Sequence, residues 1–359
     1  MDSAAFIKAV NHIVEEKNIS KDAVFEAMEL ALSTAYKKNF NALTNVRVDI
    51  NRESGEIKVF SFKTVVKDVE NEEMEISVKE AKKIVPGISE GETIEEEVTP
   101  KDFGRVAAAT AKQVVTQKIR EAERESIMAE FNDKQDELVV GLVSREDAVN
   151  YYIDLGRAHG VLPKDEVIPG EEIVMGSSLK VYISKLENTS KGPRITLSRT
   201  HYGFVKRLLE LEIPELQEGI VILYSVAREA GSRSKIAVYS EDEKVDPVGA
   251  CIGEKGERIM RISKALNGEK IDIVMYDKQP AMFIKNALSP ARDVSVYITD
   301  PKEQTAIAVA DGDNLSLAIG KRGQNVRLAA RLTRYKIDVK TSDQIREEGI
   351  DLSSFEGSD

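Results

Sequence analysis

The sequence predicts a multidomain α+β protein, in which an N-terminal α+β domain precedes a small β-barrel and two copies of one α-β-β-α-α-β unit. Three observations predict this organisation. The chain has 359 residues, more than a single domain of ordinary size holds. A helix-rich region with a few alternating runs is followed by a cluster of short strand-like runs. In the C-terminal part, the phrase "AIGKRGQN" repeats the pattern of an earlier phrase, "CIGEKGER", within matching flanks.

The composition limits the class of protein. The single cysteine, Cys251, leaves no partner for an internal disulfide, and the three histidines are too scattered for a Cys/His zinc site. No apolar run approaches the roughly 20 residues of a membrane span, and the N-terminus lacks the pattern of a secretory signal. We expect a cytoplasmic, monomeric protein without a metal, a cofactor or a membrane partner.

Residues 1–131 are expected to form the first domain. Two helices are predicted within residues 6–40, because apolar residues recur there at helical spacing. Alternating runs predict strands between residues 46 and 98, together with a short helix that opens with a capping box at Ser77. A cap followed by proline predicts a long helix over residues 99–127, which completes an α+β domain.

Residues 132–200 are expected to form the barrel, with the polar stretch 132–137 as a linker before five short strands. The succession of strands and turns resembles the S1-type OB fold. Aromatic rings on the binding strands of such a barrel stack bases for about 1–3 kcal/mol each. Strand alternation sends Tyr151 and Tyr152 to opposite faces, so we expect one as a platform and the other in the core. Tyr151 and His159 are the candidate contacts, although a plain surface histidine explains His159 equally well.

Residues 201–280 and 281–345 are predicted to be two copies of one unit. Each begins with a helical phrase that ends at a proline and continues with two alternating strands, two short helices and a closing strand. A loop joins the two short helices, Gly253–Gly256 in the first copy and Gly320–Gly323 in the second. This order, with Gly-x-x-Gly between the last two helices, resembles the bacterial (type II) KH domain.

The Gly-x-x-Gly loop has the features of a phosphate clamp. Glycine permits backbone torsions and close approaches that other residues prevent. The helix that follows presents unpaired N–H groups and the positive end of its dipole, and both attract an anion. A plain connection between two helices is the alternative for an isolated loop of this kind. Its recurrence within matching flanks favours a binding function for single-stranded nucleic acid.

The two loops differ in charge. Although the whole chain has a net charge of −11, residues 281–340 contain ten Lys and Arg against six Asp and Glu. The basic residues at and after the second loop are Lys321, Arg322, Arg327, Arg331, Arg334, Lys336 and Lys340. The first loop instead places Glu254 beside Lys255. We expect the second loop to supply more of the electrostatic binding; the alternative is that its basic side chains form a solvated face.

The order of the modules resembles the NusA family of bacterial transcription factors over nearly the whole chain. Three phrases carry the resemblance: "FGRVAAATAKQVVTQKIREAER", "DPVGACIGEKGERI" and "LAIGKRGQNVRLAARLTRYKIDV". It implies a non-enzymatic factor that docks on RNA polymerase, at the flap of the β subunit, through residues 1–131. Such a factor binds nascent single-stranded RNA and modulates pausing, intrinsic termination and, with other Nus factors, antitermination. The RNA contacts that the resemblance implies are Gly253, Lys255, Gly256, Arg258, Gly320, Lys321, Arg322, Gly323, Gln324, Asn325 and Arg327.

The chain departs from the family pattern in three places. Glu254 stands where relatives often carry an uncharged or basic residue, and Arg334–Tyr335 replaces a common Gly–Trp pair. The acidic residues 346–359 replace the acidic repeats that some relatives append, and we expect this short tail to be disordered.

Two other classes of function compete with this interpretation. An enzyme is disfavoured, because neither glycine loop has the GxxxxGK[ST] pattern of a P-loop and Cys251 is expected to pack inside a short helix. A general RNA-binding protein of translation or RNA decay, without a polymerase contact, is the second alternative. Residues 1–131 discriminate between the two, because only a transcription factor needs a polymerase-docking domain.

Overall fold

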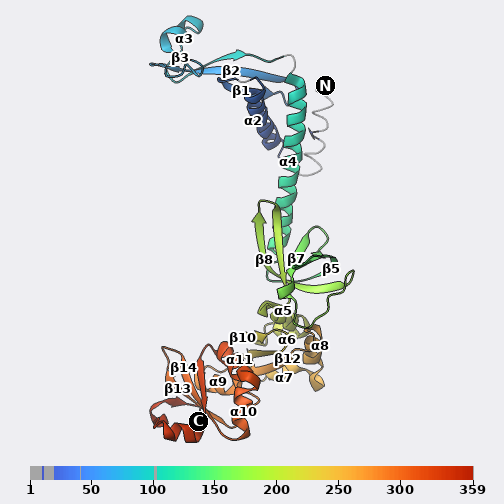
Figure 1. Ribbon diagram of the computed structural model, residues 1–359, viewed down its shortest axis with the longest axis vertical. Helices are drawn as coiled ribbons and strands as arrows, with labels where there is room; N and C mark the ends of the chain where they lie inside the picture. Colours follow the sequence, from blue (N-terminus) through green and yellow to red (C-terminus); the bar gives the residue numbers. More distant parts are fainter. Residues whose placement is uncertain (1–9, 12–19, 41, 101–102, 359) are drawn as a thin grey trace. The chain divides into compact units, whose positions relative to one another are not determined.

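The computed structural model describes residues 10–11, 20–40, 42–100 and 103–358 (Figure 1). The chain divides into two compact units, Met1–Ala129 and Glu130–Asp359. The first of the two helices expected within residues 6–40 lies almost wholly outside the described residues.

The N-terminal unit is a small sheet with helices packed against it. Its four strands are β1 (Asn45–Ile50), β2 (Ile57–Val66), β3 (Glu75–Ser77) and β4 (Thr93–Glu97). Its helices are α2 (Lys21–Phe40), α3 (Val78–Ile84) and α4 (Phe103–Asn132), the last of which extends into the second unit. Strand β2 pairs with all three other strands. The core forms where the apolar stripe of α2 meets β1 and the first turns of α4, at Phe25, Met28, Val48 and Phe103.

The junction at residues 132–137 is not the loose linker that we expected. Helix α4 continues past residue 127 to Asn132, and its last turn is anchored by Phe131, which is fully buried. The amide of Asp136 donates to the carbonyl of Ile183 (3.0 Å), and the carboxylate of Asp136 accepts from the hydroxyl of Tyr182 (2.8 Å). These bonds satisfy the polar groups of the junction within the barrel, so this stretch belongs to the folded unit.

A closed five-stranded barrel follows. Its strands are β5 (Leu138–Glu146), β6 (Asn150–Asp154), β7 (His159–Pro163), β8 (Ser178–Thr189) and β9 (Gly192–Ser198). They close in the order β5-β6-β7-β9-β8, with β7 and β9 parallel, which is the arrangement of the OB fold that the sequence predicts. Ile153, Leu162 and Leu197 fill the interior. Gly160 is required there, because a Cβ at this position would lie 2.4 Å from Leu197 Cδ1.

Two α-β-β-α-α-β units follow the barrel, and their order confirms the sequence prediction. The first consists of α5 (Tyr202–Glu212), followed by the single turn α6 (Pro214–Gln217), β10 (Ile222–Glu229), β11 (Arg233–Tyr239), α7 (Pro247–Ile252), α8 (Glu257–Ala265) and β12 (Lys270–Met275). The second consists of α9 (Pro280–Ala287), β13 (Val294–Asp300), β14 (Thr305–Ala310), α10 (Asp313–Ile319), α11 (Gln324–Thr333) and β15 (Lys336–Lys340). In each sheet the central strand is antiparallel to the strand before it and parallel to the closing strand.

A hydrophobic cluster crosses the interface between the two α-β-β-α-α-β units. Ala227 and Ala237 of the first unit belong to the same buried cluster as Leu328 and Leu332 of the second. The fully buried ammonium of Lys235 donates to the carbonyl of Ser289 (2.6 Å), so a polar bond also crosses this interface. The pair is therefore held by apolar burial as well as by hydrogen bonds.

The C-terminal segment corrects the expectation of a disordered tail. Within residues 346–358, α12 (Ser342–Glu347) ends, a 3₁₀ turn (Leu352–Ser354) follows, and β16 (Glu356–Gly357) pairs with β13. Ser358 is buried, its amide donates to the carbonyl of Val296 (3.0 Å), and its Oγ accepts from the amide of Val296 (3.0 Å). Composition alone suggested disorder, but the open edge of β13 offers backbone partners that a short segment can pair with.

Candidate nucleic-acid interface

The two Gly-x-x-Gly loops have the same backbone conformation. The first glycines, Gly253 and Gly320, have φ/ψ of 76°/173° and 71°/172°. The second glycines, Gly256 and Gly323, have 78°/16° and 72°/16°. The residue before the second glycine is left-handed in both loops, with φ of 51° at Lys255 and 53° at Arg322. The sequence repeat is thus also a repeat of loop geometry.

Close packing explains the first glycine of each loop. A Cβ at Gly253 would lie 2.7 Å from Cγ of Arg258, and a Cβ at Gly320 would lie 2.7 Å from Cβ of Asn325 and 2.8 Å from its backbone nitrogen. All three distances are shorter than a real Cβ makes with its neighbours, and the positive φ adds strain for any other residue. The loop therefore keeps its shape only with glycine at these positions.

Arg258 and Asn325, which the family resemblance assigns to RNA, bind groups of the protein itself and hold the loops together. Arg258 Nη1 donates to the carbonyl of Ala250 (2.7 Å) and to the carboxylate of Glu215 (2.7 Å). At the equivalent position of the second unit, Asn325 Nδ2 donates to three carbonyls, including that of Leu317 (3.0 Å). Asn325 is only 2% exposed, so its side chain does not face an incoming ligand. Both residues satisfy the carbonyls at the end of the preceding helix, which a helix otherwise leaves unpaired.

The charged residues of the second loop face solvent. Lys321 and Arg322 are exposed, and the described part of the chain offers neither of them an ion-pair partner within 4.0 Å. Gln324 and Arg327 instead bind a carboxylate of the first unit, that of Glu229. Lys321 and Arg322 could therefore bind a phosphate without first breaking an ion pair.

The first loop presents an exposed carboxylate at Glu254 next to the exposed Lys255. Exposed apolar side chains accompany both loops: Ile252 and Met260 in the first unit and Leu317 in the second. Sequence reasoning missed these three residues, because an apolar residue on an amphipathic helix is ordinarily assigned to the core. Their exposure next to a Gly-x-x-Gly loop suits contact with the faces of unstacked bases.

On the barrel, the outward tyrosine is Tyr152. Tyr151 pairs with Leu162 across β6 and β7 and shares its face with Ile153, so its ring points inward at the barrel end, yet it is only half-buried. Tyr152 is also half-buried, and the guanidinium of Arg145 lies 3.9 Å from its ring centroid. The two tyrosines thus lie on opposite faces, as strand alternation predicts, but the inward Tyr151 stays half-buried because Ile153 and Leu162 fill the interior.

His159 is exposed and shares the outer face of this sheet with Tyr152, since it pairs with Asp154 two residues along β6. Tyr152 donates its hydroxyl to Asp147 (2.8 Å). Hydrogen bonds from the amide of Val149, from this hydroxyl and from the amide of Asn150 lower the pKa of Asp147 to about 2. Arg145, Tyr152 and His159 thus form a mixed basic and aromatic surface on the barrel.

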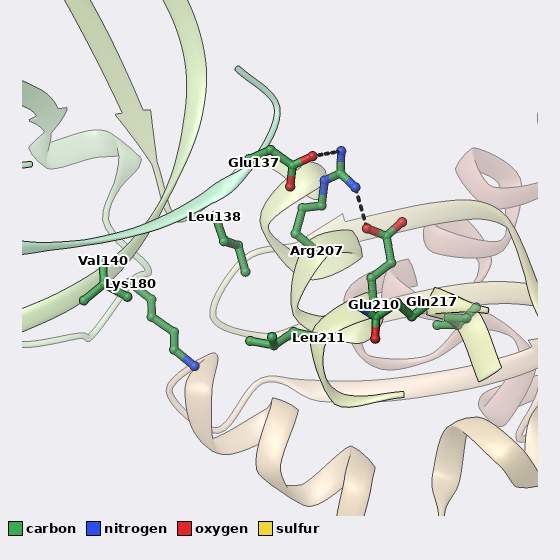
Figure 2. Close-up of a pocket in the computed structure, with 9 residues that line it drawn as sticks. Glu137, Leu138, Val140, Lys180, Arg207, Glu210, Leu211 and Gln217 are labelled. Atoms are coloured by element: carbon green, nitrogen blue, oxygen red, sulfur yellow. Dashed lines mark hydrogen bonds and ion pairs between the residues drawn. The ribbon is translucent and has the colours of Figure 1, made fainter. Parts of the chain in front are cut away.

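An ion pair and a hydrogen bond join the barrel to the first α-β-β-α-α-β unit. Figure 2 shows Arg207 of α5 between the carboxylates of Glu137 and Glu210, both at 2.6 Å, beside a pocket of about 600 Å³. Arg199, at the end of the barrel, is buried against Glu171 and donates to the carbonyl of Ala265 (3.3 Å). These contacts hold the start of β5 and the end of β9 against helices α5 and α8 of the next unit.

Other kinds of site find little support among the described residues. No group of three or more His, Cys, Asp or Glu side chains in the described ranges is placed to hold a metal ion. Cys251 is fully buried, and burial raises the pKa of its thiol to about 12, which leaves it protonated. None of the described helices combines the length and the apolar content that a bilayer crossing requires.

An OB-type barrel followed by two KH units with Gly-x-x-Gly loops defines a class: a protein with several modules that bind single-stranded RNA. Family models match the chain in three places: the NusA N-terminal domain at residues 5–125, the NusA-like first KH domain at residues 199–276 and the NusA-like second KH domain at residues 280–347. The chain belongs to the NusA family.

Curated relatives match over nearly the full chain. The transcription termination/antitermination proteins NusA of Halalkalibacterium halodurans and Bacillus subtilis are each 51% identical over 348 residues. The match covers 97% of this chain and 91% and 94% of the two relatives. The solution structure of the N-terminal domain of NusA from B. subtilis is 55% identical, with a TM-score of 0.30, and the match covers 34% of this chain and 98% of that one.

Proposed function

We propose that this protein is a transcription termination/antitermination factor that binds nascent single-stranded RNA while it is docked on RNA polymerase. The observation that carries the proposal is the pair of Gly-x-x-Gly loops with matching torsions, in a chain that belongs to the NusA family. The family consists of non-enzymatic transcription factors with RNA-binding domains. The loops supply what such a factor needs, because an exposed backbone turn with Lys321 and Arg322 can hold a sugar–phosphate chain.

The RNA surface in this proposal combines the barrel with both KH units. Its phosphate contacts are the backbone of the two glycine loops, together with Lys255, Lys321 and Arg322. Its base contacts are the exposed apolar residues beside the loops and the outer barrel face at Tyr152 and His159. We place Tyr151 at the rim of this surface rather than at its centre, because its ring points inward.

The polymerase contact is assigned to residues 1–131, at the flap of the β subunit, and other Nus factors join in antitermination. This part of the proposal is supported by the match of the N-terminal family model and by the compactness of the N-terminal unit. We further propose the domain limits 1–131, 132–200, 201–280 and 281–345, and a monomer in the cytoplasm, where bacterial transcription takes place.

The lifetime of a hairpin-stabilised pause tests this function. We expect cognate RNA polymerase to pause longer with the protein than without it, and to lose this response when residues 1–131 are deleted. RNA binding by the shortened chain should persist, because the deletion leaves the barrel and the KH units. If the full-length protein binds RNA but leaves the pause unchanged, the protein belongs with general RNA-binding proteins of translation or decay.

A further inference from the structure

A carboxylate of the first KH unit binds two side chains that lie directly after the loop of the second clamp. Glu229 ends strand β10, and its Oε1 accepts a hydrogen bond from Nε of Arg327 (2.7 Å). Its Oε2 accepts from Nε2 of Gln324 (2.8 Å), and Arg331 Nη1 lies 4.0 Å from Oε1. Both hydrogen-bonded partners belong to the first turns of α11, directly after the Gly320–Gly323 loop. One carboxylate thus binds two side chains that lie next to the proposed phosphate-binding loop.

The geometry around Arg327 links this carboxylate to the loop itself. Arg327 Nη1 donates to the carbonyl of Arg322 (3.2 Å), the loop residue in the left-handed conformation. The Arg327 side chain remains 44% exposed, and that of Glu229 is 22% exposed. Hydrogen bonding from Arg327 lowers the pKa of Glu229, which keeps the carboxylate charged at neutral pH. A carboxylate anion is therefore already bound to Arg327, beside the loop.

We propose that Glu229 is an internal competitor for RNA: its carboxylate occupies Arg327 and Gln324 until an RNA phosphate takes these two side chains over. The inference rests on the proposed function of the KH loops as RNA clamps. Under this proposal, the RNA affinity of the second clamp depends on a residue of the first KH unit. It also explains how two residues that family resemblance assigns to RNA are engaged within the protein.

An RNA phosphate can replace the Glu229 carboxylate at little cost in stability, because the interface between the KH units does not depend on this ion pair. A hydrophobic cluster crosses the interface between the KH units, and Ser225 Oγ donates across it to the carbonyl of Leu332 (3.1 Å). A partly exposed ion pair contributes only about 0–1 kcal/mol, so a phosphate with its own charge-assisted bonds can replace it. The freed carboxylate can then turn towards solvent.

The test is Glu229→Gln in the full chain, with a single-stranded RNA probe long enough to reach both loops. The substitution keeps the size of the side chain and removes its charge. We expect RNA affinity to rise about threefold to tenfold at low salt, with a salt dependence steeper by about one unit of slope. Glu243→Gln is the matched control, because it removes one charge from an exposed position of the same unit. It should raise the affinity by less than twofold.

A second arm separates competition from a general effect of charge. Arg327→Gln alone should weaken binding, and Glu229→Gln on that background should lose most of its gain. The proposal is overturned if Glu229→Gln leaves the affinity unchanged, or lowers it together with the melting temperature, which would mark a structural ion pair. It is also overturned if the gain persists without Arg327. If the unaltered chain fails to bind the probe, the proposed function fails instead.

Discussion

The first and second KH units share a fold and a loop conformation but differ in the chemistry that they present. The torsions of the two Gly-x-x-Gly loops are closely similar, and Arg258 and Asn325 perform the same task from equivalent positions. The exposed loop residues are Glu254 and Lys255 in one unit and Lys321 and Arg322 in the other. Packing thus fixes the shape of the loop, while its charge is free to vary, so a common fold does not imply an equal share of the binding energy.

Reversal of the charges in the second loop should reveal the largest difference in RNA binding between the two KH units. Lys321→Asp with Arg322→Asp places two carboxylates where phosphate is expected, so RNA affinity should fall roughly 10- to 100-fold, and the salt dependence should flatten by about two units of slope. Lys255→Asp in the first loop should cost about threefold. Fluorescence anisotropy at several salt concentrations measures both, with circular dichroism as the control for folding. Equal losses from the two loops would show that the second is not the main contact.

Alanine at the first glycine of each loop should destabilise the two KH units by different amounts. Both positions have positive φ, but a Cβ at Gly320 meets the backbone nitrogen of Asn325, whereas at Gly253 it meets mainly the side chain of Arg258. A backbone atom yields less readily than a flexible side chain. We expect Gly320→Ala to destabilise the second unit by about 2 kcal/mol and Gly253→Ala by about 1 kcal/mol. Thermal unfolding of the two variants measures this, and an equal or reversed order would contradict the packing argument.

The repeat, its element order and its loops could be predicted from the sequence because they are encoded locally. Glycines, prolines and alternating apolar residues leave a signal within a few positions. The roles of Arg258 and Asn325 could not be predicted, because they depend on which carbonyls the preceding helix leaves unpaired in the folded unit. The order of the tail at Ser358 depends in the same way on the open edge of β13. The bond between Glu229 and Arg327 joins residues far apart in the chain, and no local pattern marks it.

Glu254→Lys tests the same charge difference by changing the first loop instead of the second. It gives the first loop the charge pattern of the second, and the exposed position imposes no packing constraint. RNA affinity should rise about fivefold at low salt, and this gain should fade as salt screens the added charge. Glu254→Gln, which removes the negative charge without adding a positive one, should give an intermediate value. An unchanged affinity for both variants would mean that RNA does not pass close to the first loop.

The smallest effect is expected at the end of the helix that follows each loop. Arg334 caps α11 in the left-handed conformation (φ 64°), and the equivalent residue of the first unit, Asn267, is also left-handed (φ 57°). Asparagine tolerates this conformation better than arginine does, and glycine tolerates it best. We therefore expect Arg334→Gly to stabilise the second unit by about 0.5–1 kcal/mol and Asn267→Gly to change the first by less than about 0.5 kcal/mol. Because Arg334→Gly also removes one of the basic residues near the clamp, RNA affinity measured alongside the melting temperature shows whether this side chain serves the turn alone. Higher stability with unchanged affinity would assign it no part in binding, whereas a loss of affinity would add Arg334 to the basic surface of the second clamp.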